Sequence, residues 1–179
     1  MATQPVPGNY VSRNAIGTRY QSGAPVAGTN AVQTLTIGGT PTGGTFRLRF
    51  DGWTTGPITW SATNATLLAN IQAALDALPN GAASAIVATA GTLTAGIGTV
   101  VLTFSGYPLN KKLVAVITIA DNSLTGTSPT LAIANTTPGV DATHRSAPEG
   151  TLLVDTATGI PYINQGVPGA PVWTKVSGT

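Results

Sequence analysis

Two stretches in the first third of the chain alternate apolar and polar residues, as expected of half-buried β-strands. In VQTLTIG (32–38) leucine and isoleucine alternate with threonine, and in TFRLRF (45–50) phenylalanine and leucine alternate with threonine and arginine. The glycine-rich residues 38–44 between them predict a loop. Asp51-Gly52 then predicts a two-residue hairpin turn with Phe50 opposite Trp53, because glycine accepts the positive φ of a type I′ turn.

One later segment, TNATLLANIQAALDALPNG, has the spacing of an amphipathic helix. Thr63 or Asn64 can cap its start, Pro79-Asn80-Gly81 ends it, and its apolar stripe consists of Leu67, Leu68, Ile71, Leu75 and Leu78. Further strands are expected at 85–89, 99–105, 112–119 and 130–135, with a turn at 121–123. Residues 31–140 therefore predict an α+β, mostly β fold: an antiparallel sheet module with one amphipathic helix.

The first 30 residues contain several prolines and glycines without sustained periodicity, which predicts an extended N-terminal arm (1–30). Two interpretations stay open: a disordered terminus, and an arm that becomes ordered on contact with a partner. In the second interpretation, the contact residues of the arm are Tyr10, Arg13, Arg19 and Tyr20.

The end of the chain (141–179) predicts a linker followed by a β-hairpin segment. LLVDTATGIPYIN (152–164) places a strand on each side of a three-residue turn, Ala157-Thr158-Gly159, and a last strand, VWTKV, follows Pro171. Residues 146–179 number 34, below the roughly 40 that a domain usually needs without disulfides, metal or oligomerisation. The hairpin therefore needs copies of itself or a docking partner, through the expected oligomer contacts Leu152, Val154, Ile160, Tyr162 and Trp173.

Composition narrows the classes of partner. Only 8% of residues are charged, against about 25% in ordinary soluble domains, and the net charge of +2 is small for a nucleic-acid binder. There is no cysteine for a disulfide or thiolate site. The N-terminus lacks a signal-peptide pattern, and no stretch approaches the roughly 18 apolar residues of a membrane span. We expect a soluble protein, made in a cytoplasm, that binds neither nucleic acid nor membrane.

No combination of residues predicts catalysis. A hydrolase or transferase needs a nucleophile with a base, paired carboxylates or a metal cluster. The single histidine, His144, follows no such motif and is interpreted as a solvated or contact residue, and the six carboxylates are scattered. The sequence at 121–123 lacks the other oxygen ligands of a calcium loop, and Gly96-Ile97-Gly98 precedes a strand instead of opening a helix. We therefore expect no enzyme activity, no cofactor and no metal.

Basic and aromatic side chains leave two alternatives open. Lys111-Lys112 and the Arg47/Arg49 pair are interpreted as solvated faces, with contact to an acidic surface as the alternative. A sugar-stacking platform is the alternative to core and interface roles for the aromatic residues Trp53, Trp60, Tyr107 and Trp173.

Two parts of the chain resemble structural proteins of tailed bacteriophages. The run from AVQTLTIGG through TGGTFRLRFDGWTTGPITW, the helix segment, VVLTFSG and DNSLTGTSPTLAIANTTPG covers 31–140 and resembles a module of phage virion proteins and of some large bacterial surface proteins. GTLLVDTATGIPYIN, followed by APVWTKV, is similar to terminal hairpins of phage head-decoration and fibre-like proteins. Both resemblances point to a virion.

The resemblance implies a non-enzymatic capsid decoration (cement) or head-fibre-like protein. It further implies the major capsid protein of the phage head as partner, a homo-oligomer for which we expect a trimer, assembly in the bacterial host cytoplasm, and a place on the capsid exterior. Trp53 departs from the module, where a polar residue commonly follows the turn, so we expect an exposed aromatic used for contact. The alternative is a tail-associated or surface adhesive module that binds host glycans through Trp53 and Tyr107.

Overall fold

The structure, a computed structural model, describes residues 18–79 and 84–176. The chain divides into two compact units. Unit 2 spans Gly28–Ala142, and unit 1 combines the described residues up to Ala27 with those from Thr143 onward. The predicted arm and the predicted tail therefore contribute to one unit, whereas the sequence suggested two separate segments.

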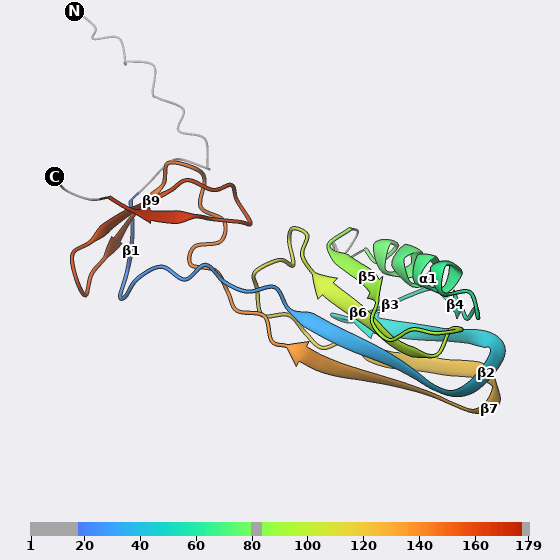
Figure 1. Cartoon of the computed structure of the whole chain (residues 1–179). Helices are drawn as coiled ribbons and strands as arrows, with labels where there is room; N and C mark the ends of the chain where they lie inside the picture. Colours follow the sequence, from blue (N-terminus) through green and yellow to red (C-terminus); the bar gives the residue numbers. More distant parts are fainter. Residues whose placement is uncertain (1–17, 80–83, 177–179) are drawn as a thin grey trace, which may run out of the picture. The chain divides into compact units, whose positions relative to one another are not determined.

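Unit 2 is a six-stranded antiparallel sheet with one helix among its described residues (Figure 1). The strand order is β3-β2-β6-β5, and β4 and β7 also pair with β2. The elements are β2 (Val32–Phe50), β3 (Trp53–Thr54), β4 (Ile58–Thr59), α1 (Asn64–Asp76), β5 (Ile86–Ala90), β6 (Gly98–Phe104) and β7 (Thr118–Thr137). The predicted mostly β composition with one helix on antiparallel strands is confirmed for this unit.

Strands β2 and β7 pair over nearly their whole length and form a ribbon that doubles back at its middle (Figure 1). Residues 38–44, predicted to be a loop, carry this bend but remain paired with β7. The pairing register shifts between Gly38 and Thr40 and again between Pro41 and Gly43. Such bulges bend a strand and favour glycine. The glycines that suggested a loop therefore lie in a bent part of β2.

Strand β7 replaces two predicted strands, 112–119 and 130–135, and the turn predicted between them. It continues through the polar residues 121–123, where Ser123 pairs with Thr45. Residues 113–117 have no regular secondary structure. The turn prediction is wrong because the long partner strand β2 satisfies the backbone groups of these residues, and pairing overrides their local preference.

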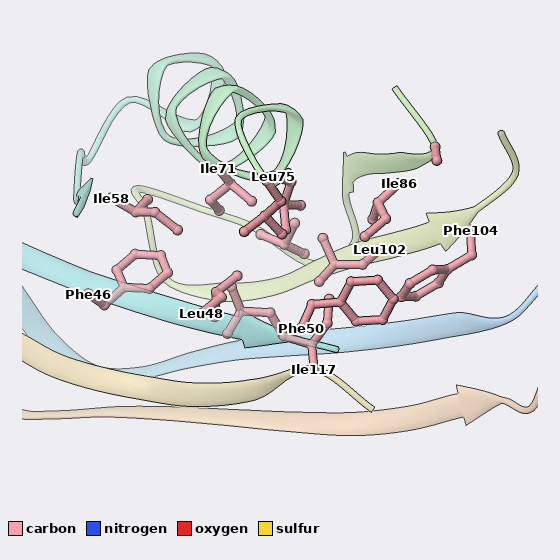
Figure 2. Close-up of a cluster of buried hydrophobic side chains, with 14 of the residues drawn as sticks. Phe46, Leu48, Phe50, Ile58, Ile71, Leu75, Ile86, Leu102, Phe104 and Ile117 are labelled. Atoms are coloured by element: carbon pink, nitrogen blue, oxygen red, sulfur yellow. The ribbon is translucent and has the colours of Figure 1, made fainter. Parts of the chain in front are cut away.

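The apolar stripe of α1 packs on the sheet as predicted. Leu67, Ile71 and Leu75 are fully buried and meet a cluster of side chains from the strands (Figure 2). Each such side chain contributes about 1.5–3 kcal/mol through burial. Thr63 occupies the N-cap position without a side-chain bond. Asn64 instead donates to the Leu93 carbonyl and accepts from Gly96 N–H, which ties the start of the helix to the loop before β6.

The predicted hairpin at Asp51-Gly52 is present. Both residues have positive φ, 48° and 83°, and Phe50 pairs with Trp53. Phe50 is buried and packs on Phe104 with ring centroids 5.4 Å apart, as Figure 2 shows. Trp53 is 52% exposed, so the expected exposure is found, while its use in a contact stays a prediction.

Unit 1 contains a four-stranded sheet whose strands come from both ends of the chain. Its order is β1-β8-β9-β10, with β1 (Thr18–Gln21), β8 (Leu152–Asp155), β9 (Pro161–Asn164) and β10 (Trp173–Lys175). Strand β1 runs parallel to β8, and the other neighbours are antiparallel. Residues 18–21 are therefore part of a sheet within this chain, and not of an arm free to cover a neighbouring protein.

Candidate functional site

The hairpin of β8 and β9 has a four-residue loop, Thr156–Gly159, where the sequence predicted a three-residue turn. Asp155 donates its backbone N–H to the Ile160 carbonyl, and Val154 pairs with Pro161. The predicted turn would have placed Tyr162 opposite Val154. Since one extra loop residue shifts the register by one, the side chains of β9 lie on the opposite face from the predicted one.

Asp155 stabilises this longer loop. Its buried carboxylate accepts hydrogen bonds from Ala157 N–H at 2.9 Å, from the Thr158 hydroxyl at 2.7 Å and from Gly23 N–H at 2.7 Å. These bonds, led by that of Thr158, lower the pKa of Asp155, although burial acts in the opposite direction. One carboxylate thus fixes the hairpin loop and ties it to the N-terminal part of unit 1.

Cross-strand pairing sorts the side chains of this sheet into two faces, because paired residues point to the same side and successive residues alternate. One row across all four strands consists of Arg19, Leu153, Tyr162 and Lys175. We call the face with this row the covered face; Asn164 and Trp173 also lie on it. We call the opposite face the open face, and its side chains include Tyr20, Leu152, Val154, Pro161 and Ile163.

Residues 143–148 lie against the covered face. Trp173 donates its indole N–H to the Thr143 carbonyl at 2.9 Å. Asn164 donates its amide N–H groups to the carbonyls of Ala147 and Pro148 at 2.9 and 3.0 Å. Ala147 and Asn164 are almost fully buried as a result. The chain itself therefore fills this face of the sheet.

The open face retains apolar side chains in partial contact with solvent. Tyr20 is 67% exposed, and Leu152, Val154, Pro161 and Ile163 are half-buried. None of these five side chains carries a charge. An apolar, uncharged group of neighbouring side chains is typical of the centre of a protein interface.

Unit 1 buries few apolar side chains by its own folding. Among its described residues the buried apolar side chains are Ala147, Leu153 and Pro171, and the buried polar side chains are Thr151, Asp155 and Asn164. A unit of this size usually needs disulfides, a metal or oligomerisation. The chain has no cysteine, and the residues that the structure describes contain no group of three His, Asp or Glu that could hold a metal.

His144 lies at the edge of the covered face, where its ring meets the Trp173 ring edge-on at a centroid distance of 6.3 Å. Its Nε2 atom is buried and has no hydrogen-bond partner within the described part of the chain. Burial lowers the pKa of His144, and the positive charge of Arg19 lowers it further. The fold of unit 1 therefore favours the neutral imidazole.

Unit 1 is expected to lose stability as the pH falls below about 6.5, the ordinary pKa of histidine. Because the pKa of His144 is lower in the folded state, the unfolded chain binds more protons between the two pKa values. Stability is therefore complete above this interval and decreases through it as the solution is acidified. Thermal unfolding between about pH 7.5 and pH 5 measures the effect.

The control is His144→Asn, since asparagine tolerates the positive φ of 45° at this position. His144 is the only histidine of the chain. The variant should therefore remove the pH dependence in this range, and an unchanged slope would contradict the assignment.

The structure separates the residues predicted to contact a partner. Tyr10 and Arg13 lie outside the described residues. Arg19 is half-buried on the covered face, and Tyr20 is exposed on the open face. Trp53 belongs to unit 2. These residues therefore do not form one contact site within either unit.

The predicted oligomer contacts also fall on different faces. Leu152 and Val154 lie on the open face with Tyr20, whereas Tyr162 and Trp173 lie on the covered face. Ile160 is next to the hairpin loop, opposite Asp155. Sequence reasoning missed Pro161 and Ile163, which complete the open face. The signal that could have found them is the Asp155 side chain, because an aspartate that bonds to the backbone two residues on begins a turn at its own position.

The four candidate sugar-stacking aromatics have different surroundings. Trp53 and Tyr107 are 52% and 66% exposed, while Trp60 is half-buried and donates its indole N–H to the Gly96 carbonyl at 2.9 Å. Trp173 belongs to unit 1. Only the first two are exposed enough to contact a ligand with a whole ring face.

No helix within the described residues has the length and apolar character needed to cross a membrane.

Comparison with known proteins finds distant structural likeness. No family model matches the chain, and no curated protein matches it. A solved structure from Mycobacterium phage Patience is similar with a TM-score of 0.41 and 16% sequence identity, over 87% of this chain and 48% of that chain. The chain thus spans about half the length of that structure.

Proposed function

We propose that the chain is a non-enzymatic structural protein of a bacteriophage virion, and more specifically a capsid decoration protein that binds the major capsid protein of the assembled head. The resemblance of residues 31–140 and of the terminal hairpin to phage structural proteins supports the virion assignment. The observation that carries the proposal is the small apolar core of unit 1. Its described residues bury only three apolar side chains, Ala147, Leu153 and Pro171, while its open face stays in contact with solvent, which suits a component of an assembly.

In this proposal the chain acts as a trimer on the capsid exterior, after assembly in the host cytoplasm. Trp53, Tyr10 and Arg13 are the proposed contacts with the shell. A ligand that binds the assembled shell and not its separate subunits stabilises the shell by mass action. Several such contacts in one oligomer add through avidity, so each of them can be weak.

The full-length chain is expected to co-sediment with empty phage heads and to raise their melting temperature. Binding should saturate at a fixed ratio to the major capsid protein, and unassembled capsid subunits should bind much more weakly. The measurement is sedimentation of heads with increasing amounts of the chain, followed by thermal unfolding of the complexes. Absence from the pellet, or equal binding to unassembled subunits, would argue against decoration.

Trp53→Ala is expected to weaken head binding about tenfold or more, because an exposed tryptophan at the centre of an interface commonly contributes at least about 2 kcal/mol. The matched control is Tyr107→Ala, which removes another exposed aromatic ring of unit 2. Equal head binding by the wild type and Trp53→Ala would remove Trp53 from the shell contact without affecting the decoration proposal itself.

A second candidate function is adhesion to host glycans by a tail-associated or surface protein. The exposure of Trp53 and Tyr107 favours it, because ring faces open to solvent suit sugar rings. Binding to a glycan array that is lost in Trp53→Ala, together with no binding to heads, would support this function over decoration.

A further inference from the structure

We propose that the open face of unit 1 is the surface through which copies of this chain associate with one another. This inference rests on the homo-oligomer part of the proposed function and names its surface. It assigns Tyr20, first expected to touch the capsid, to self-association together with Leu152 and Val154. It also adds two residues that the sequence did not indicate, Pro161 and Ile163.

The five apolar side chains of the open face form two neighbouring rows, and the uncharged Thr18 and Thr174 extend the second row onto the edge strands. Tyr20, Val154 and Pro161 are in register across three strands, and Leu152 pairs with Ile163 in the next row of the same face. Residues in register on adjacent strands are neighbours, so these side chains present one contiguous apolar surface. The covered face cannot serve this purpose, because residues 143–148 already bond to its side chains.

The shortage of buried apolar residues in unit 1 indicates that the occupant is a second copy. A partner that completes the fold must be present wherever the chain folds, and copies of the chain itself meet this condition at every site of synthesis. Binding to the folded state then stabilises unit 1 by mass action. A foreign partner met only after assembly would leave the unit unsupported before that meeting.

Charge supports the same occupant. When a face meets a copy of itself, any charge that it carries is brought close to an identical charge, which costs free energy. The side chains of the open face are uncharged, whereas Arg19 and Lys175 lie on the covered face. The distribution of charge is thus compatible with self-association through the open face.

The edges of the sheet are less suited to association. The edge strands are β1 and β10, with four and three residues. Short edge strands offer few backbone groups for the addition of another strand, and natural proteins use them to prevent such pairing. Association through the face therefore fits this sheet better than strand addition.

The test is Tyr20→Glu in the full-length chain, with Tyr107→Glu as the matched control. The two tyrosines have nearly equal exposure, 67% and 66%, so neither substitution removes much buried surface. Wild type and control are expected to show the same mass above that of one chain in sedimentation equilibrium. Tyr20→Glu should raise the dissociation constant about tenfold or more, a change of about 1.4 kcal/mol or more per contact.

A second pair of variants keeps strand propensity and shape nearly constant. Val154→Thr places a hydroxyl on the open face, and Val167→Thr makes the same change at a valine that is 60% exposed in a loop. We expect association to weaken about threefold or more in Val154→Thr, since an unpaired hydroxyl is costly to bury in an apolar interface. The control should keep the wild-type dissociation constant.

The possible outcomes separate this inference from the proposed function. An oligomer that persists unchanged in Tyr20→Glu and Val154→Thr would overturn the open face as the interface and leave the homo-oligomer in place. A wild-type chain with the mass of one copy at every concentration would overturn both the open-face interface and the proposed homo-oligomer. Co-sedimentation with heads decides the decoration role independently of either result.

Discussion

Replacement of Asn164 by alanine is expected to unfold unit 1 and to leave unit 2 folded. Asn164 is 1% exposed, and its amide makes four hydrogen bonds. It donates to the carbonyls of Ala147 and Pro148, and its oxygen accepts from the N–H groups of Gly166 and Val172, at 2.9 Å each. At about 0.5–1.5 kcal/mol for each bond, the loss is about 2–6 kcal/mol. A core of this size rarely supplies more than about 3–5 kcal/mol, so little stability would remain.

Hydrogen exchange followed by mass spectrometry can measure this effect in each unit separately. Peptides from β8 and β9 should lose their protection in Asn164→Ala, whereas peptides from α1 and β6 should keep it. Gln165→Ala is the control: its exposed side chain accepts a hydrogen bond from the Thr174 hydroxyl at 2.8 Å, and the loss of this bond should leave both units protected. Retained protection of β8 and β9 in Asn164→Ala would show that the four bonds are not what holds the segment over the covered face.

Elements with a local physical cause could be predicted from the sequence. The stripe of leucines and isoleucine identified α1, because a helix repeats its faces within its own segment. The Asp51-Gly52 turn could be recognised because both residues accept a positive φ. The alternation in 32–37 and 45–50 likewise identified strand residues, since Leu35 and Leu48 are both buried in the structure.

Elements that depend on distant pairing could not be predicted in this way. Residues 118–137 form one strand because β2 pairs with them along its bent course, and their own sequence favoured a turn. Strand β1 consists of TRYQ, which has no strand signal. It forms a strand because β8 offers it a free edge more than 130 residues away in the sequence. Local propensity carries no information about either partner.

The sequence predicted the wrong side chains of β9 for the candidate site, because the predicted hairpin loop is one residue too short. The sequence identified Leu152 and Val154 correctly as neighbours on one face, but a three-residue turn would bring Tyr162 to them. With four residues in the loop, Pro161 and Ile163 take that place. A strand has a side-chain period of two, so a one-residue error exchanges the faces completely. The loop length, which the hydrogen bonds of Asp155 stabilise, therefore determines which side chains of β9 lie on the open face.

Phe104→Ala is expected to have the largest effect on unit 2. Phe104 is fully buried at the end of β6 and packs on Phe50 at a centroid distance of 5.4 Å, among the core side chains in Figure 2. Removal of a buried phenylalanine ring costs about 3–5 kcal/mol, because it loses burial and leaves a cavity. We expect the melting temperature of unit 2 to fall by about 10 °C or more.

The matched variant is Phe104→Leu, which keeps most of the apolar volume and loses the aromatic pair. Such pairs contribute about 0.5–1.5 kcal/mol, so its cost should be clearly smaller than that of Phe104→Ala. Equal destabilisation by both variants would mean that the ring contact with Phe50, and not the filled volume, dominates at this position. Each unit has its own buried residues, so exchange protection in β8 and β9 should stay unchanged in both variants. A joint loss of protection in the two units would instead show that unit 1 folds only on a folded unit 2.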